Sequence, residues 1–205
     1  MLKIWGRASS VNVQKVLWCA DELGLAYERV DIGGAFGGND QPAYRAKNPN
    51  GLVPTIEEDD GFILWESNTI VRYLSAKHGK LSPGDPRARA DAERWMDWQL
   101  TTIARDMTTV FWGLVRTPPD KRDPAAIEAA AKSLNGLWGR LDAHLKDRAF
   151  VGGNAFTMGD IPVGCLAYRW LNLPISRVSL PNLEAWYGRL GERAPYRKNV
   201  MVPMT

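Results

Sequence analysis

Apolar positions in the first 79 residues change between strand-like and helix-like spacing. Residues 2–5 form a short apolar run, and residues 28–32 alternate between apolar and polar side chains. Between these segments, apolar side chains recur at helical spacing up to Gly24: Val13, Val16, Leu17, Ala20 and Leu23. Residues 55–58 and 62–65 flank the turn signal Asp60-Gly61, and residues 67–78 return to helical spacing. The order β-α-β, then β-β-α, predicts an α/β domain over residues 1–79.

The remainder of the chain has only helical patterns. Residues 80–86 contain two prolines and one glycine, which is typical of a linker. Beyond it, helices are predicted over residues 87–116, 124–146, from about 157, and 181–190, followed by an extended tail that contains Tyr196. The inward face of the first of these helices is expected to comprise Ala92, Trp95, Met96, Leu100, Ile103, Met107, Val110 and Leu114. We therefore expect an all-helical domain over residues 87–205.

Charge and cysteine content exclude several classes of function. The chain has 26 basic and 23 acidic residues without a basic run, so nucleic-acid binding is not indicated. The first residues lack the apolar core of a signal peptide, and no apolar run could span a membrane. Cys19 and Cys165 are predicted to be reduced core thiols, and no cluster has metal-ligand spacing. These features favour a soluble cytoplasmic protein that binds no metal, nucleic acid or membrane.

Two short motifs suggest a binding site for a peptide with a free amino-acid end. Val53 precedes Pro54, so its backbone is extended and its N–H and C=O can pair with another chain. Ser67 opens a predicted helix whose unpaired N–H groups suit a carboxylate, and Glu66 supplies a negative charge for an ammonium group. Together they indicate a γ-glutamyl peptide such as glutathione. Alternatively, Ser67 is an ordinary helix cap and Val53-Pro54 only begins an edge strand.

The same motifs resemble those of cytosolic glutathione S-transferases over essentially the whole chain. Residues 48–54, Asn-Pro-Asn-Gly-Leu-Val-Pro, are similar to the family segment that ends in a cis proline. The resemblance implies a thioredoxin-like domain followed by a helical domain, a homodimer, and glutathione as co-substrate without a metal. It also implies that Val53 pairs with the cysteinyl residue of glutathione, while Glu66 and Ser67 hold its γ-glutamyl end. Many relatives have a basic residue where this chain has Gly51, and Lys47 or Arg45 is expected to substitute for it.

The residues before the first helix contain three candidates for stabilising the thiolate of glutathione. A cysteine thiol has a pKa of about 8.5, so an enzyme must lower it to use the thiolate at neutral pH. Residues 7–15 contain no tyrosine and no cysteine, which leaves Ser9, Ser10 and Asn12 as hydrogen-bond donors. The spacing of serine-type families (zeta, delta and theta-like) favours Ser10 over Asn12, and Asn12 over Ser9. The alternative is that all three only cap the helix.

A second stripe on the helix predicted over residues 87–116 suggests a site for an apolar co-substrate. Trp98, Thr102, Arg105, Thr109 and Trp112 recur at helical spacing opposite the predicted core face. We expect Arg105, Thr109 and Trp112 to line the second-substrate site, with Trp98 nearer a partner subunit. The alternative is that later helices cover this stripe. Phe36, in a glycine-rich loop, is a candidate lid.

The predicted function is conjugation of the glutathione thiolate to small electrophilic, apolar substrates, a detoxifying reaction. One alternative keeps the fold but performs glutathione-dependent isomerisation or dehalogenation. A second alternative is a protein that binds glutathione or aromatic ligands without turnover.

Overall fold

The computed structural model describes the complete chain, residues 1–205, which divides into two compact units. The first comprises Met1–Ser82 and Pro195–Val202, and the second comprises Pro83–Ala194 and Pro203–Thr205. The division between Ser82 and Pro83 falls inside the proline-containing segment 80–86. No helix in the chain combines the length and the apolar character needed to cross a bilayer.

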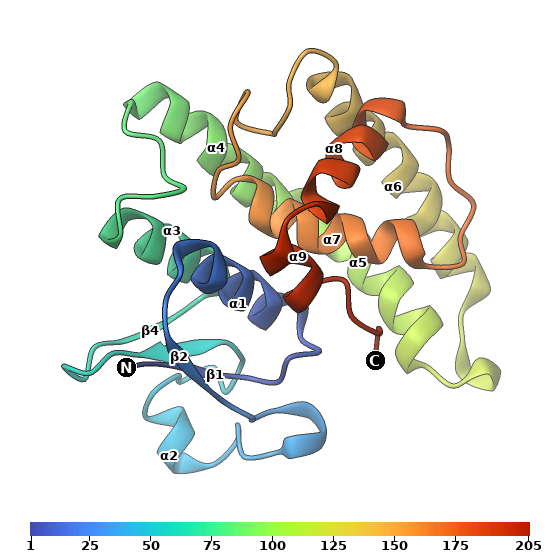
Figure 1. Cartoon of the computed structure of the whole chain (residues 1–205). Helices are drawn as coiled ribbons and strands as arrows, with labels where there is room; N and C mark the ends of the chain where they lie inside the picture. Colours follow the sequence, from blue (N-terminus) through green and yellow to red (C-terminus); the bar gives the residue numbers. More distant parts are fainter. The chain divides into compact units, whose positions relative to one another are not determined.

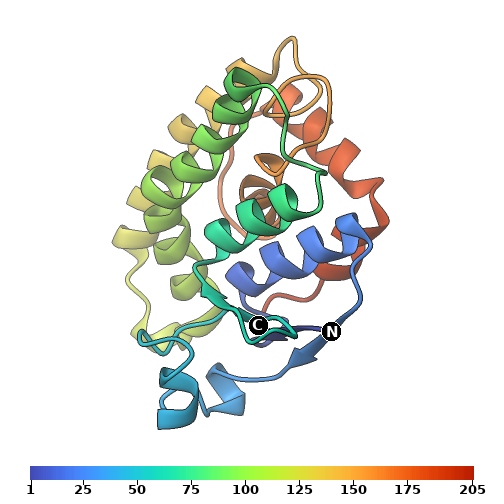
Figure 2. The same ribbon diagram turned by 90° about the vertical axis from the view of Figure 1, so that its left-hand side faces the viewer.

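The first unit contains a four-stranded mixed sheet with helices on both faces (Figure 1). The strands β1 (Leu2–Trp5), β2 (Tyr27–Val30), β3 (Thr55–Glu57) and β4 (Ile63–Trp65) lie in the order β2-β1-β3-β4. β1 is parallel to β2 and antiparallel to β3, and β3 pairs with β4 as a hairpin. Helices α1 (Val11–Leu23) and α3 (Ser67–Lys77) lie side by side on one face, and α2 (Pro42–Arg45) lies on the other (Figures 1 and 2). This is the predicted β-α-β, β-β-α order.

Local sequence explains where α1 ends and why two short elements of this unit were not predicted. Gly24 adopts the left-handed conformation directly after α1, with φ of 73°, which a residue without Cβ adopts without strain. The sequence did not indicate α2 or the 3-10 turn Gly34–Phe36, because four and three residues are too few to establish a period.

Both cysteines are buried and free, and burial raises the pKa of the Cys19 thiol to about 12.

The C-terminal tail was predicted as extended and as part of the helical domain, and the structure differs on both points. Residues Ala194–Asn199 form helix α9, and residues 195–202 belong to the first unit. Tyr196 is completely buried, with its ring centroid 4.6 Å from that of Trp18. Nδ2 of Asn199 and Nζ of Lys198 lie 2.6 and 2.8 Å from Oδ2 of Asp21 on α1. Burial of an aromatic ring and two polar contacts hold this short helix, and none of these contacts is visible in the local pattern.

The second unit is all-helical. Its helices are α4 (Pro86–Trp98), α5 (Ala104–Phe111), α6 (Pro124–Leu145), α7 (Asp160–Asn172) and α8 (Pro181–Gly191). Helix α7 lies inside the bundle, in contact with α4, α5 and α8, and α6 packs on α5 and α8 (Figure 2). Ten of the thirteen residues of α7 are buried, which explains its nearly continuous apolar sequence.

The helix predicted over residues 87–116 is interrupted by two π-helical turns, Gln99–Ile103 and Trp112–Arg116. A π-helical turn contains an extra residue, so the side chains after it are rotated relative to an α-helical pattern. At the start of the first of these turns, Gln99 is 3% exposed, whereas Leu100, predicted to be in the core, is 51% exposed. The prediction for Leu100 was therefore wrong, because the polar residue Gln99, three residues after Met96, takes the inward position instead.

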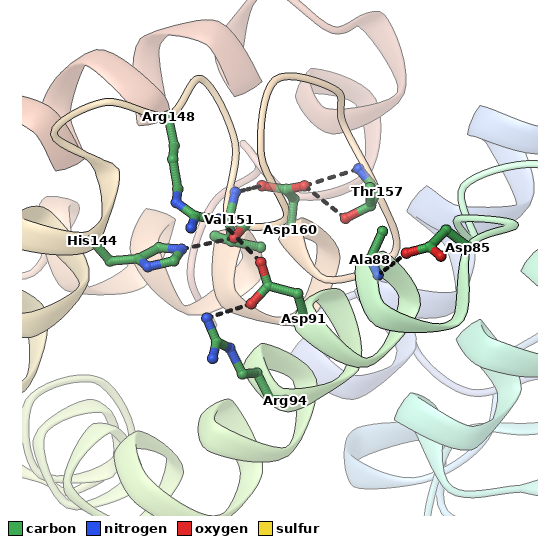
Figure 3. A network of polar contacts seen from close by, with 9 residues as sticks. All are labelled: Asp85, Ala88, Asp91, Arg94, His144, Arg148, Val151, Thr157 and Asp160. Carbon is green, nitrogen blue, oxygen red and sulfur yellow. Dashed lines mark hydrogen bonds and ion pairs between the residues drawn. The ribbon is translucent and has the colours of Figure 1, made fainter.

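A buried carboxylate organises the start of α7 (Figure 3). Asp160 is completely buried, and its oxygens accept hydrogen bonds from the backbone N–H groups of Val151 and Thr157, both at 2.9 Å. It also accepts from the Thr157 hydroxyl at 3.3 Å and from Nε1 of Trp186 on α8 at 2.9 Å. Burial raises the pKa of Asp160 to about 6, although these four donors oppose the shift. Asp160 thus ties Thr157, Val151 and helix α8 to the first turn of α7, and the sequence did not indicate the contact with Trp186.

Candidate functional site

The turn before β3 is held by side chains from α2 and the residues after it. The carbonyl of Leu52 accepts hydrogen bonds from the Tyr44 hydroxyl at 2.7 Å and from Nδ2 of Asn48 at 2.9 Å. Tyr44 and Asn48 also contact the hydroxyl of Thr55, at 2.9 and 3.2 Å. All three side chains are buried. They fix the backbone on both sides of Val53-Pro54, so this turn is a rigid element.

Val53 presents an unused backbone edge. The Val53–Pro54 peptide bond is cis, as the family resemblance implied. The N–H and C=O of Val53 form no hydrogen bond within the chain, although Leu52 and Thr55 on either side are engaged. Backbone groups that are held rigidly and left unpaired can bind an extended peptide as an added strand.

Glu66 and Ser67 occupy the start of α3, immediately after β4. Glu66 is the residue before the first helical turn, so it takes the cap position for which Ser67 was considered, and its side chain forms no capping hydrogen bond. Its φ of 73° lies in the left-handed region, which is uncommon for a residue with a Cβ. The Glu66 carboxylate is exposed and unpaired, whereas Ser67 is 7% exposed. A strained residue that presents a free carboxylate beside a helix N-terminus is typical of a binding site.

The three candidates for thiolate stabilisation lie in the connection between β1 and α1. Ser10 is the N-cap residue of α1, yet its side chain forms no capping hydrogen bond, and the residue is 9% exposed. Asn12 is exposed in the first turn, and Ser9 is partly exposed. The capping alternative therefore does not account for the Ser10 hydroxyl. Ser10 is positioned as a donor beside the N-terminus of α1, where an anion is favoured.

The surroundings of Gly51 distinguish between the two basic residues expected near it. Gly51 has φ of 62°, and a Cβ placed on it would lie 2.9 Å from the Asn39 carbonyl oxygen, so glycine is required there. The Lys47 ammonium lies 2.8 Å from Glu57, and its hydrogen bond holds the pKa of the Glu57 carboxyl below its usual value. Arg45 is exposed, with its guanidinium 3.4 Å from that same Cβ position. Arg45 is thus the basic residue next to Gly51, and Lys47 is engaged with the sheet.

The glycine-rich loop after β2 approaches the connection between β1 and α1. Gly33 and Gly34 both have positive φ, and a Cβ on Gly34 would lie 2.8 Å from Nε of Arg7. The Arg7 side chain therefore packs directly over this loop. Phe36, the predicted lid, is 60% exposed at the end of the 3-10 turn.

Sequence reasoning missed Lys15. This residue of α1 is completely buried, and its Nζ lies 3.2 Å from Oδ1 of Asn68 and 3.5 Å from Oγ of Ser67. The only signal in the sequence was a lysine inside an apolar helical run, between Val13 and Val16. Such a lysine is readily interpreted as an exposed residue, because lysine is almost never fully buried unless it is paired.

The residues predicted to line the second-substrate site lie on α5 and directly after it, in the second unit. Arg105 and Thr109 lie on α5, and Trp112 begins the π-helical turn after it. Arg105 and Trp112 are exposed, Trp112 by 54%, while the Thr109 hydroxyl donates to the Arg105 carbonyl at 3.3 Å. Trp98, by contrast, is partly covered, because its ring centroid lies 5.2 Å from that of Trp95 on the same helix and 6.3 Å from that of Trp138 on α6. No group of three or more His, Cys, Asp or Glu side chains in the chain could hold a metal ion.

Comparison with known proteins identifies the family. The glutathione S-transferase N-terminal domain profile matches residues 5–85, and the C-terminal domain profile matches residues 124–189. The chain is 44% identical over 208 residues to glutathione S-transferase GstB of Escherichia coli, with all of both chains covered. The theta class glutathione S-transferase of Xanthomonas axonopodis pv. citri, solved with glutathione bound, superimposes with a TM-score of 0.96 at 50% identity, covering 100% of this chain and 99% of that one. The chain belongs to the glutathione S-transferase family.

Part of the chain is also similar to a protein of a different name. Elongation factor 1-gamma of Equus caballus is 33% identical over 152 residues, which are 73% of this chain and 34% of that protein. A sequence similar to about three quarters of this chain is therefore found as one part of a longer protein.

Proposed function

We propose that this chain binds glutathione in its first unit and transfers the thiolate to small, apolar electrophiles. The observation that carries the proposal is the set of unused groups in one unit: the backbone edge of Val53, the carboxylate of Glu66 and the hydroxyl of Ser10. They match the peptide backbone, ammonium group and thiolate of glutathione respectively. The bound glutathione in the Xanthomonas relative supports the same assignment.

In the proposed reaction, the chain's own residues bind and orient glutathione. Val53 pairs with the cysteinyl backbone, and Glu66 with the first turn of α3 holds the γ-glutamyl ammonium and carboxylate. The Ser10 hydroxyl donates a hydrogen bond to the sulfur, which favours the thiolate over the thiol. The thiolate then attacks an electrophilic carbon, forming a carbon–sulfur bond and displacing a leaving group or saturating a double bond. Catalysis comes from positioning and from stabilisation of the negative charge.

Glutathione binding is tested with Glu66→Gln and Ser67→Ala. We expect Glu66→Gln to raise the Kd for glutathione about 10- to 100-fold, because it removes a charged hydrogen-bond partner of the ammonium group. Ser67→Ala is expected to raise the Kd about tenfold, since it removes one donor to the carboxylate. Isothermal titration calorimetry gives both values. Glu28→Gln on β2 and Thr69→Ala in the first turn of α3 are matched controls, because both side chains are exposed. Unchanged binding in the two test variants would refute the proposed site.

The glycyl carboxylate of glutathione is proposed to interact with Arg45. Its guanidinium lies next to Gly51, whereas Lys47 is engaged with Glu57. We expect Arg45→Ala to raise the Kd for glutathione about fivefold, a modest effect because an exposed ion pair is weak. Lys47→Ala is expected to lower thermal stability and to change the Kd less than Arg45→Ala does. A larger effect of Lys47→Ala on the Kd would assign the role to Lys47.

The proposal places the electrophile against Arg105, Thr109 and Trp112 of the second unit. The exposed indole of Trp112 supports this assignment. Trp112→Ala is expected to raise the KM for an aromatic electrophile and to leave the Kd for glutathione unchanged. Equal KM values in the wild type and the variant would exclude this role.

The proposal further includes a cytoplasmic homodimer involved in detoxification. Exposed Phe62, which packs on Tyr73, supports an interface, and sedimentation of the purified chain tests it.

One observation favours a second candidate function. Similarity to part of elongation factor 1-gamma is compatible with a chain that uses this fold for binding without turnover. Such a chain would bind glutathione with an unshifted thiol pKa. Isomerisation and dehalogenation remain outcomes of the substrate assay, since both require the same activated thiolate.

A further inference from the structure

Lys15 has a completely buried ammonium group on α1. It lies within a stretch, Val13 to Ala20, in which every residue is buried. Burial of an ammonium group is costly because the charge loses its hydration, so buried lysines are kept near groups that interact with them favourably. We therefore expect the buried ammonium group of Lys15 to interact favourably with the groups around it.

The Lys15 ammonium is directed at the first turn of α3. Its Nζ lies 3.2 Å from Oδ1 of Asn68 and 3.5 Å from Oγ of Ser67. Ser67 and Asn68 are the first two residues of α3, and both are buried. Helices α1 and α3 lie side by side on one face of the sheet (Figure 2), so the packing of the two helices fixes this contact.

The Lys15 ammonium, 3.5 Å from Oγ of Ser67, favours one direction of the Ser67 hydroxyl. A serine oxygen accepts hydrogen bonds and donates a single hydrogen, whereas an ammonium group only donates. Lys15 therefore occupies an acceptor position of Ser67, and the hydroxyl hydrogen is left for another acceptor. A hydroxyl that accepts from a cation is also a stronger donor, because hydrogen bonds in a chain polarise one another. Ser67 is thus prepared to donate to an anionic acceptor.

The charges at this point favour the same kind of ligand. The N-terminus of a helix carries a partial positive charge, and the first turn of α3 contains no acidic side chain. The protonated form of Lys15 has a charge of the same sign. A carboxylate bound at the first turn interacts favourably with both, while a neutral group of the same shape gains much less.

We propose that Lys15 is a positioning residue that makes the first turn of α3 selective for the free α-carboxylate of the γ-glutamyl residue. The inference rests on the proposed function, because it takes glutathione as the ligand of Glu66 and Ser67. Lys15 acts through Ser67 and Asn68 and does not touch the ligand. Its contribution therefore depends on the charge of the ligand at this carboxylate and not on the ligand's size.

The test compares glutathione with glutathione amidated at the γ-glutamyl α-carboxylate. Calorimetric titrations are made with the wild type, Lys15→Met and, as a matched control, Lys80→Met, whose lysine is exposed in the same unit. Lys15→Met is expected to raise the Kd for glutathione at least about tenfold and to change the Kd for the amide less than about twofold. Lys80→Met is expected to change neither. An equal effect of Lys15→Met on both ligands, or no effect, would overturn the proposal.

If the Lys15→Met variant fails to fold, the role of Lys15 is tested by a measurement on the wild type. With lysines labelled at Cε, the buried Lys15 gives a carbon resonance that follows its protonation. We expect saturation with glutathione to shift the titration of this resonance to higher pH, and saturation with the amide to leave it unchanged. The same titration with both ligands would refute the role of Lys15.

The outcomes separate this inference from the proposed function. If the wild type binds no glutathione, both are wrong. If glutathione binds and Ser67→Ala weakens it, but Lys15→Met keeps the full preference for the free carboxylate, only the assignment of Lys15 is wrong.

Discussion

Replacement of Ser10 by alanine is expected to lower kcat/KM for glutathione transfer about 100-fold, in the range seen for loss of one donor to a developing anion. The bound thiol should then titrate near about 8.5, the value of a free cysteine thiol. The physical reason is that the Ser10 hydroxyl is not used by the first turn of α1, so it is available to the sulfur. Thiolate absorbance of bound glutathione across pH, together with steady-state rates, measures both effects.

The two other candidates provide the comparison for Ser10. Asn12 is exposed and Ser9 is partly exposed, so Asn12→Ala and Ser9→Ala are expected to shift the thiol pKa much less than Ser10→Ala. If Asn12→Ala alone restores the ordinary thiol pKa, the amide is the donor and Ser10 is not. If glutathione binds with an ordinary thiol pKa in the wild type, the chain is a binding protein and the transferase proposal fails.

Replacement of Asp160 by alanine is expected to lower the free energy of unfolding by about 4 kcal/mol. Four donors would lose their acceptor, and each buried donor left unsatisfied costs about 1–3 kcal/mol, partly recovered by relaxation. For a chain of this size the melting temperature should fall by about 10 °C. Calorimetric unfolding tests this, with the exposed Asp120→Asn as the control. A loss below about 1 kcal/mol would mean that water replaces the carboxylate.

The pH dependence of this effect has a defined sign. Burial raises the pKa of Asp160 to about 6, above its value of about 3.9 in an unfolded chain. A group with a raised folded-state pKa contributes stability below the unfolded pKa, and this contribution is lost as the pH rises through the folded pKa. The unfolding free energy of the wild type relative to Asp160→Asn should therefore decrease between about pH 4 and 6. An increase over that range would show that the four hydrogen-bond donors lower the pKa of Asp160 more than burial raises it.

Much of the fold was predictable because the decisive signals are local. Strand β1 and the end of α1 at Gly24 follow from apolar spacing and a left-handed glycine. The hairpin of β3 and β4 follows from the turn signal Asp60-Gly61. Leu100 was misplaced because the inward position after Met96 is taken by a polar residue, Gln99, which an apolar pattern does not mark. Helix α9 was missed because it depends on Trp18 and Asp21, far away in sequence.

The candidate site divides in the same way. The order of Val53-Pro54, Glu66-Ser67 and the donors Ser9, Ser10 and Asn12 follows from the sequence alone, because these groups lie at strand and helix ends that local patterns define. Packing between distant elements is needed to show that the Ser10 hydroxyl is not used for capping, that Lys47 is engaged with Glu57, and that Lys15 lies beneath Ser67. These facts depend on which elements pack together. The packing of α1 on α3 places a lysine from one helix at the first turn of another. Local spacing does not reveal which residues of two helices come into contact.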